Sequence, residues 1–202
     1  MNTSIKPFGS LSARKIPAPK APLAWKLSNA LRFAFMRGWL AFHFIAPLAR
    51  AFGLAVAYGK LEAVLMRKDG TRVNYGVLGY RVVTDAFVAF VTDQLQVETS
   101  IFGDFKYHDS GVGVTAENAA NTTIETTDGE ARATGTQTES AANAYRSVGT
   151  ISYTTTKAIT EHGLFNDLTA GTLMDRTVFT AINVVSGDSI AFTYTLTISA
   201  GG

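Results

Sequence analysis

Hydrophobic and polar residues alternate most regularly at the C-terminal end of the chain. A period of two places every second side chain on the same face of a β-strand. We therefore expect a strand over residues 189–199, whose threonines at 193, 195 and 197 face outward. The apolar side chains that we expect to face the core are Ile190, Phe192, Tyr194, Leu196 and Ile198.

Similar short segments fill much of the preceding chain. Asp69-Gly70 lies between two apolar runs, 61–67 and 71–83, and this dipeptide is the strongest short-range signal for a β-hairpin. Turn-forming residues also occur at 109–111, 128–129, 166–167 and 186–188. The other predicted strands are 102–108, 122–127, 130–138, 144–155, 158–166 and 172–183, with 139–143 as a short link. Strands spaced by about 8–12 residues favour a sandwich or barrel, and we predict a mainly β, antiparallel β-sandwich of jelly-roll-like type.

One segment among these strands has a helical period instead. Thr84 suits the N-cap position, and Asp85 in the first turn interacts favourably with the helix dipole. The apolar stripe at positions i, i+1, i+4 and i+8 consists of Phe87, Val88, Val91 and Leu95. We therefore expect one helix over residues 84–96 that packs against the β-domain.

Charge divides the chain into two parts. Residues 1–60 hold nine Lys or Arg and no Asp or Glu, whereas residues 61–202 hold nine basic and all sixteen acidic residues. This asymmetry predicts a basic N-terminal arm over 1–60 and an acidic β-sandwich domain over 61–202 that includes the helix. An arm of this sign is attracted to polyanions such as nucleic acid or an anionic membrane.

The arm itself has two parts. Four prolines within residues 1–22 favour an extended conformation, whereas Leu23, Leu27, Leu31 and Phe35 recur at i+4 and favour a helix. Its longest charge-free run is the twelve residues from Gly38 to Ala49, which is shorter than the roughly 20 residues of a membrane span.

Several interpretations of the arm stay open. The first group of candidates comprises an interfacial amphipathic helix, a transit peptide, a packed internal helix and a virion arm. The last candidate is translated sequence upstream of a true start at Met66. A secretory signal fits poorly, because the charged and proline-rich region before the apolar stretch is too long.

The overall composition excludes disorder and weighs against an enzyme. Hydrophobic residues make up 47% of the 202 residues, so the chain has ample apolar surface to bury. The absence of cysteine excludes disulfides and thiolate metal sites. Three histidines leave little material for a histidine-rich metal site or a catalytic pair.

Two histidine–carboxylate neighbours are the first candidates for chemistry. They are His108-Asp109 and Glu161-His162, and a metal site would require them to converge in space with further ligands. Their spacing matches no known ligand pattern. We expect instead a loop histidine and a strand histidine that makes a structural hydrogen bond, and we place His43 of the arm in an interface or core.

The remaining candidates also have ordinary structural interpretations. The glycine-rich stretch 111–116 lacks the third glycine and the lysine of a phosphate loop, so we expect a β-turn. Ser147 and Ser152 lack the spacing of a nucleophile elbow. Asp128-Gly129-Glu130 is typical of a hairpin tip, and Asn121-Thr122-Thr123 matches a glycosylation sequon that matters only in secreted eukaryotic proteins. We therefore predict no catalytic, cofactor-binding or metal-binding residues and no enzymatic activity.

Two long runs resemble segments of tailed-bacteriophage virion structural proteins. They are GDFKYHDSGVGVTAENAANTTIETTDGEARATGTQTES and ITEHGLFNDLTAGTLMDRTVFTAINVVSGDSIAFTYTLTISAGG, the second with an E-x-G-L-F element similar to that of tail-fibre and collar proteins. The resemblance covers about residues 66–202 and leaves the basic arm outside. It implies a β-sandwich virion component displayed in many copies.

The resemblance also sets the expected function. It implies a non-enzymatic structural protein, foremost a capsid decoration or cement protein, and as the alternative a neck, tail or fibre-attachment protein. Its partners are then the major capsid protein or neck and tail proteins, together with copies of itself, in the virion and in the host cytoplasm during assembly. A different class also remains: a membrane- or nucleic-acid-associated protein that acts through the basic arm.

Overall fold

Two antiparallel β-sheets form the body of the protein. The structure, a computed structural model, describes residues 19–35, 44, 46–52, 54–81, 83–95 and 105–199. The helices in this part of the chain are α1 (Leu23–Phe35), α3 (Ala46–Ala51) and α4 (Asp85–Gln94). The strands are β1 (Val56–Met66), β2 (Arg72–Arg81), β3 (Tyr107–Gly111), β4 (Ala133–Thr134), β5 (Thr136–Ala141), β6 (Ala144–Ser152), β7 (Lys157–Phe165), β8 (Leu173–Val184) and β9 (Ser189–Ser199). Sheet A has the order β2-β1-β9-β6-β5 and sheet B the order β4-β3-β7-β8.

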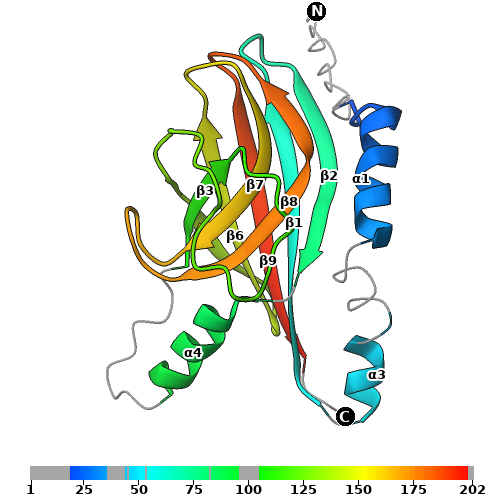
Figure 1. Cartoon of the computed structure of the whole chain (residues 1–202), viewed down its shortest axis with the longest axis vertical. Coiled ribbons are helices and arrows are strands. Elements are labelled where there is room, and N and C mark those ends of the chain that lie inside the picture. Colours follow the sequence, from blue (N-terminus) through cyan, green and yellow to red (C-terminus); the bar gives the residue numbers. More distant parts are fainter. Residues whose placement is uncertain are drawn as a thin grey trace, which may run out of the picture.

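The two sheets share one hydrophobic core. Alternate side chains of each strand point inward, as a period of two requires, and buried side chains from both sheets form one cluster. Figure 1 shows the strands of both sheets in the body of the molecule. Sheet A contributes Leu61, Leu65, Leu78, Ile151, Ile190, Phe192 and Tyr194, and sheet B contributes Ile159, Leu164, Met174, Phe179, Ile182 and Val184. The predicted mainly β, antiparallel architecture is confirmed.

Strand β9 follows the predicted alternation except at its end. Ile190, Phe192, Tyr194 and Leu196 are buried, but Ile198 is 53% exposed. Figure 1 shows that β1 and β9 extend past sheet B at this end, so Ile198 has no opposing sheet to cover it. The prediction that Ile198 faces the core is therefore wrong.

Helix α4 begins where the sequence predicts. The Thr84 side chain accepts a hydrogen bond from the Phe87 amide, and Phe87 is buried. The Phe87 and Phe90 rings pack edge-on against Phe105, with centroid distances of 5.1 and 5.0 Å. Only one side of the predicted stripe reaches the core, however, because Val88 and Leu95 are exposed.

Three parts of the strand assignment differ from the structure. Residues 122–127 do not form a strand, since only an isolated bridge joins Thr127 to Gly111. The residues at 109–111, predicted as a turn, belong to β3. The single predicted strand 130–138 is divided at Gly135 into β4 of sheet B and β5 of sheet A. Local sequence cannot show this transfer between sheets, because both halves have the same extended pattern.

The N-terminal segment contributes to the sheets. Strand β1 begins at Val56 and lies between β2 and β9, so the expected boundary between residues 60 and 61 falls inside a central strand. A chain beginning at Met66 would retain only the last residue of β1. The sheets described here therefore require residues that precede Met66.

Helix α1 also contacts the body. Trp25 Nε1 donates to the carbonyls of Thr180 and Ala181 at 3.0 and 3.1 Å, and the Trp25 ring packs edge-on against Tyr75. Asn29 is buried and bridges the two sheets, since it donates to Leu78 O and accepts from the Thr180 amide. The expectations for residues 1–18 and 36–43 lie outside the described residues.

Candidate functional site

Strand pairing brings the two predicted histidines into contact. Strands β3 and β7 are antiparallel neighbours, with Ser110 opposite His162 and His108 opposite Leu164. The Nδ1 atom of His108 lies 2.9 Å from Nε2 of His162, and both residues are fully buried. The two histidine–carboxylate dipeptides thus converge through their histidines.

A serine from the other sheet completes the chain of hydrogen bonds. Ser147 of β6 places its Oγ 2.9 Å from Nε2 of His108. The order serine–histidine–histidine has the hydrogen-bond arrangement of a nucleophilic triad, with the second histidine in the place of the orienting acid. All three side chains are buried, however, so Ser147 is closed to a substrate. The spacing around Ser147 gave no sign of this contact with His108, because the two residues lie on strands of opposite sheets.

Burial fixes the charge state of this cluster. The pKa of His108 is lowered to about 3, because charging a buried imidazole removes it from water. Burial also lowers the pKa of His162 well below its usual value, and the neighbouring His108 lowers it further. Both rings are therefore neutral near pH 7, and one hydrogen is shared between them. The cluster links sheet A to sheet B through polar contacts inside the core.

Glu161 and Arg176 form a second polar cluster on the outer side of sheet B. Glu161 Oε2 accepts from Arg176 Nε at 2.7 Å, and both side chains are buried. The Glu161 carboxylate also accepts from the backbone amides of Gly113, Glu125 and Thr126, at 2.9, 3.0 and 2.8 Å. Four hydrogen bonds satisfy this buried charge, as its desolvation requires.

Arg176 extends the same cluster into the long loop between β3 and β4. Its guanidinium donates to Thr115 O and Asn121 Oδ1, and it pairs with Glu125 at 3.1 Å. Residues 113–126 are thus held against sheet B by charge-assisted bonds, which take the place of a strand ladder. This explains why residues 122–127 stay near the sheet without forming a strand. Glu161 is fully buried by these bonds, whereas Glu125 is exposed at the surface.

Asp109 turns away from the histidines. Its carboxylate pairs with Arg132 Nε at 3.0 Å; burial raises the pKa of Asp109, and the bond from Arg132 opposes part of that rise. Arg132 lies over the Phe165 ring, 3.5 Å from its centroid, and donates to loop carbonyls of Asp167 and Ala170. Asp109 therefore anchors the β7–β8 loop.

The other sequence candidates are also engaged in local structure. Asp128 accepts a hydrogen bond from the Ser110 hydroxyl, and Glu130 pairs with Lys157 at 2.6 Å. Gly111 belongs to β3, and residues 112–114 lead into the loop held by Glu161. Ser152 is exposed at the end of β6. His43 lies outside the described residues.

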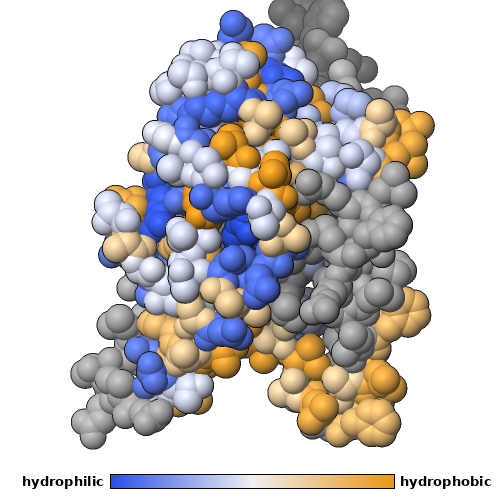
Figure 2. Space-filling view, in the orientation of Figure 1, coloured by the Kyte–Doolittle hydropathy of each residue, from blue (hydrophilic) through white to orange (hydrophobic). Residues whose placement is uncertain are grey.

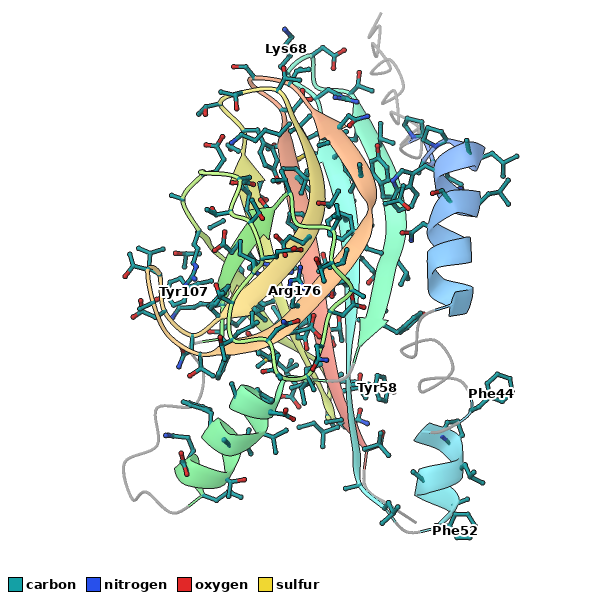
Figure 3. The ribbon with its side chains drawn as sticks, in the orientation of Figure 1. Phe44, Phe52, Tyr58, Lys68, Tyr107 and Arg176 are labelled. Carbon is teal, nitrogen blue, oxygen red and sulfur yellow. The ribbon has the colours of Figure 1, made fainter. Side chains whose placement is uncertain are left out.

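The exposed surface differs in character from these closed clusters. Hydrophobic side chains gather over α3 at the end of the molecule where β1 begins (Figure 2). Figure 3 shows Phe52 at the end of α3, pointing away from the sheets. The exposed large hydrophobic side chains in and next to the described helices are Leu23, Leu27, Phe44, Leu48, Phe52, Leu54, Val88 and Leu95. Exposed hydrophobic side chains that form a contiguous patch are typical of interaction sites.

Across the described residues, no group of three or more His, Asp or Glu side chains is arranged to hold a metal ion. None of the helices described in the structure has the length and apolar character needed to cross a membrane. Protein-family models, curated proteins and solved structures give no match to the chain.

Proposed function

We propose that this protein is a non-enzymatic structural component of a tailed-bacteriophage virion, present in many copies and acting as a capsid decoration or cement protein. One observation carries the proposal: Ser147, His108, His162 and Glu161 are buried inside the fold, while large hydrophobic side chains around α3 and α4 are exposed. A protein built in this way acts through binding surfaces.

The closed clusters support a structural role. An enzyme needs a nucleophile, a base and a place for substrate within hydrogen-bond distance of one another. Ser147 and His108 satisfy the first two conditions, but their full burial leaves no place for a substrate. The same buried bonds connect sheet A, sheet B and the loop at residues 113–126 into one rigid body, which suits a particle component.

The finer architecture belongs to the same proposal. We infer a β-sandwich from the shared core, and the jelly-roll-like type stays a prediction. Three hairpins each lie within a single sheet: β1–β2 and β5–β6 in sheet A, and β7–β8 in sheet B. Jelly rolls, in contrast, are built from Greek keys. The observed strand order thus supports the sandwich more than the jelly roll.

The location of the protein in a purified particle tests the proposal. Particles isolated from an infected host should contain this chain at a copy number that matches a symmetric arrangement on the head. Gold-labelled antibodies should bind over the head surface. Labelling at the neck or tail would favour the alternative position in the virion, and absence from the particle would contradict the virion role.

A further inference from the structure

Helix α1 covers the side of the body on which both sheets end. Among the strands that the structure describes, β2 is the last strand of sheet A on this side and β8 is the last strand of sheet B. The two strands lie next to each other, and α1 runs alongside β2 (Figure 1). The outer side of an edge strand presents a row of backbone N–H and C=O groups, which can pair with a strand of another chain.

Side chains of α1 bind these backbone groups on both sheets. Trp25 Nε1 donates to the carbonyls of Thr180 and Ala181 on β8 at 3.0 and 3.1 Å. Asn29 donates to Leu78 O of β2 and accepts from the Thr180 amide of β8, both at 3.3 Å. Trp25 and Asn29 stand four residues apart, so they lie on one face of the helix. This face takes the place of a further strand on each sheet.

The residues just before α1 continue this cover along β2. Lys20 forms a parallel β-bridge with Asn74. The Asn74 amide donates to Pro19 O, and the Ala21 amide donates to Asn74 O, both at 2.9 Å. Residues 19–21 thus occupy the outer side of β2 as a short added strand, and α1 begins directly after them at Leu23.

The opposite edges of the two sheets are protected in a different way. There sheet A ends with β5 and sheet B with β4, which have six and two residues. Strand β5 reads TQTESA, so this edge is short and polar. Strands β2 and β8 have ten and twelve residues, and their stretches 73–80 and 177–184 contain no charged residue. Long, uncharged edges pair with other chains unless something covers them.

We propose that α1 is a protective cap, which keeps the β2 and β8 edges from pairing with the edge strands of a second copy of the chain. A second copy is the partner of an uncapped edge, because edge pairing uses backbone groups and every copy carries the same two edges. The cap consists of the face with Trp25 and Asn29. Leu23 and Leu27 are 71% and 57% exposed, so they lie on the face of α1 that is turned away from the edges. Edge protection of this kind is independent of the virion role.

Paired substitutions on the two faces of α1 test the cap in the full-length chain. Trp25→Ala with Asn29→Ala removes the covering contacts, whereas Leu23→Ala with Leu27→Ala changes the outer face of the same helix and is the matched control. Alanine is the best helix former, so neither pair weakens the helix itself. In sedimentation velocity, the covering-face variant should shift to larger species than the parent at equal concentration, and the control should match the parent.

An engineered disulfide makes the test reversible within one chain. Ser28 Oγ lies 3.2 Å from Thr180 Oγ1. The chain has no cysteine of its own, so Ser28→Cys with Thr180→Cys introduces the only two thiols. Added to the covering-face substitutions, this pair should abolish the extra self-association when it is oxidised, because the disulfide holds α1 on β8. Reduction with dithiothreitol should restore the larger species.

Amide hydrogen exchange locates the contact between copies. The amides of Asn74 and Thr180 donate to the cap in the parent. In the reduced variant they should exchange quickly at low protein concentration and become protected as the larger species form. Protection that is confined to other strands would contradict pairing at these edges.

Circular dichroism and thermal melts should show that the variants are folded. If the covering-face variant does not fold, Asn29→Ala alone takes its place, since it keeps the Trp25 contacts, and it should shift in the same direction by a smaller amount. A folded variant that associates no more than the parent would overturn the cap. The same conclusion would follow from a control that associates as strongly as the covering-face variant, or from an oxidised form that still associates.

Discussion

Gly149 of β6 lies directly against the ring of His108 on the opposite sheet. A Cβ atom added at Gly149 would come within 2.4 Å of His108 Cδ2, a distance that real Cβ atoms essentially never show. Gly135 packs on the same ring from the crossing between β4 and β5, with 2.8 Å from its added Cβ to His108 Nε2. The imidazole therefore occupies space that two glycines leave open, and the sheets approach closely at this point.

Gly149→Ala should destabilise the fold by about 1–3 kcal/mol, the usual cost of forcing extra atoms into a packed core. Urea unfolding measures the change. The double variant with His108→Ala should be less destabilised than the sum of the two single variants, because removing the ring creates room for the methyl group. Strictly additive effects would show that the two residues are not in contact.

Acid should destabilise the protein through the buried histidines. The folded-state pKa of His108 is about 3, and that of His162 is also lowered by burial, whereas the unfolded chain protonates histidine near pH 6.5. The unfolded state then binds more protons as the pH falls, so stability is full above about pH 6.5 and decreases below it. Two such groups give a slope approaching about 2.7 kcal/mol per pH unit.

Urea unfolding between pH 7.5 and 5 measures this slope. NMR provides the direct control, because the ring signals of His108 and His162 should not shift across the same range while the protein stays folded. A ring that titrates near pH 6.5 in the native protein would show that the histidine is accessible to water.

Glu161→Gln should lower the free energy of unfolding by about 3–5 kcal/mol, the usual effect of breaking a buried ion pair. Arg176 would lose its buried carboxylate partner and keep only the exposed Glu125, and residues 113–126 would lose part of their anchor. Limited proteolysis should then cut within this loop. The matched control is Glu62→Gln, which breaks the partly exposed Lys60–Glu62 pair of 2.8 Å and should cost less than about 1 kcal/mol. Equal losses of stability in Glu161→Gln and Glu62→Gln would contradict the role of Glu161 as an anchor of this loop.

Phe192→Ala should cost about 3–5 kcal/mol, because it opens a cavity in the shared core. Phe192 is fully buried and packs on the His162 ring with a centroid distance of 4.6 Å. Ile198→Ala lies on the same alternating stripe of β9 but is exposed, so its cost should be within about 0.5 kcal/mol. Thermal and urea unfolding should show a much larger loss of stability for Phe192→Ala than for Ile198→Ala.

A chain truncated to residues 66–202 should fail to fold, in contrast to the interpretation of Met66 as the true start. It lacks all of β1 except Met66, and with it the buried side chains of Leu61, Ala63 and Leu65 and one of the two strands that pair with β9. A chain of residues 19–202 keeps β1 and α1 and should melt cooperatively. A cooperative melt of the shorter chain would contradict the central position of β1.

Local patterns predicted the elements better than their connections. The Asp69-Gly70 turn joins β1 to β2, with Gly70 at a φ of 84°. The Thr84 cap and β9 were also predicted, because period, cap and turn chemistry are properties of neighbouring residues. The division at Gly135 and the loop at 122–127 were not predicted. Both depend on partners far away in the chain, which local patterns do not contain.

The histidines illustrate the same limit at the level of the candidate site. The amino-acid sequence shows a cysteine-free chain with two histidine–carboxylate neighbours and an acid-free N-terminal segment, and its pattern predicts a mainly β fold. The structural role predicted for His162 agrees with its buried hydrogen bond to His108, but His108 lies in a strand and not in a loop.

Tertiary packing sets which side of β7 faces the core and which side faces the loop at residues 113–126. Successive side chains of a strand point to opposite faces, so Glu161 and His162 enter different clusters although they are adjacent in the chain. Packing between the sheets then brought Ser147 to His108, and the loop at residues 113–126 brought its amides to Glu161. These contacts depend on how strands distant in sequence pair and stack, and that arrangement is set by burial of the whole core.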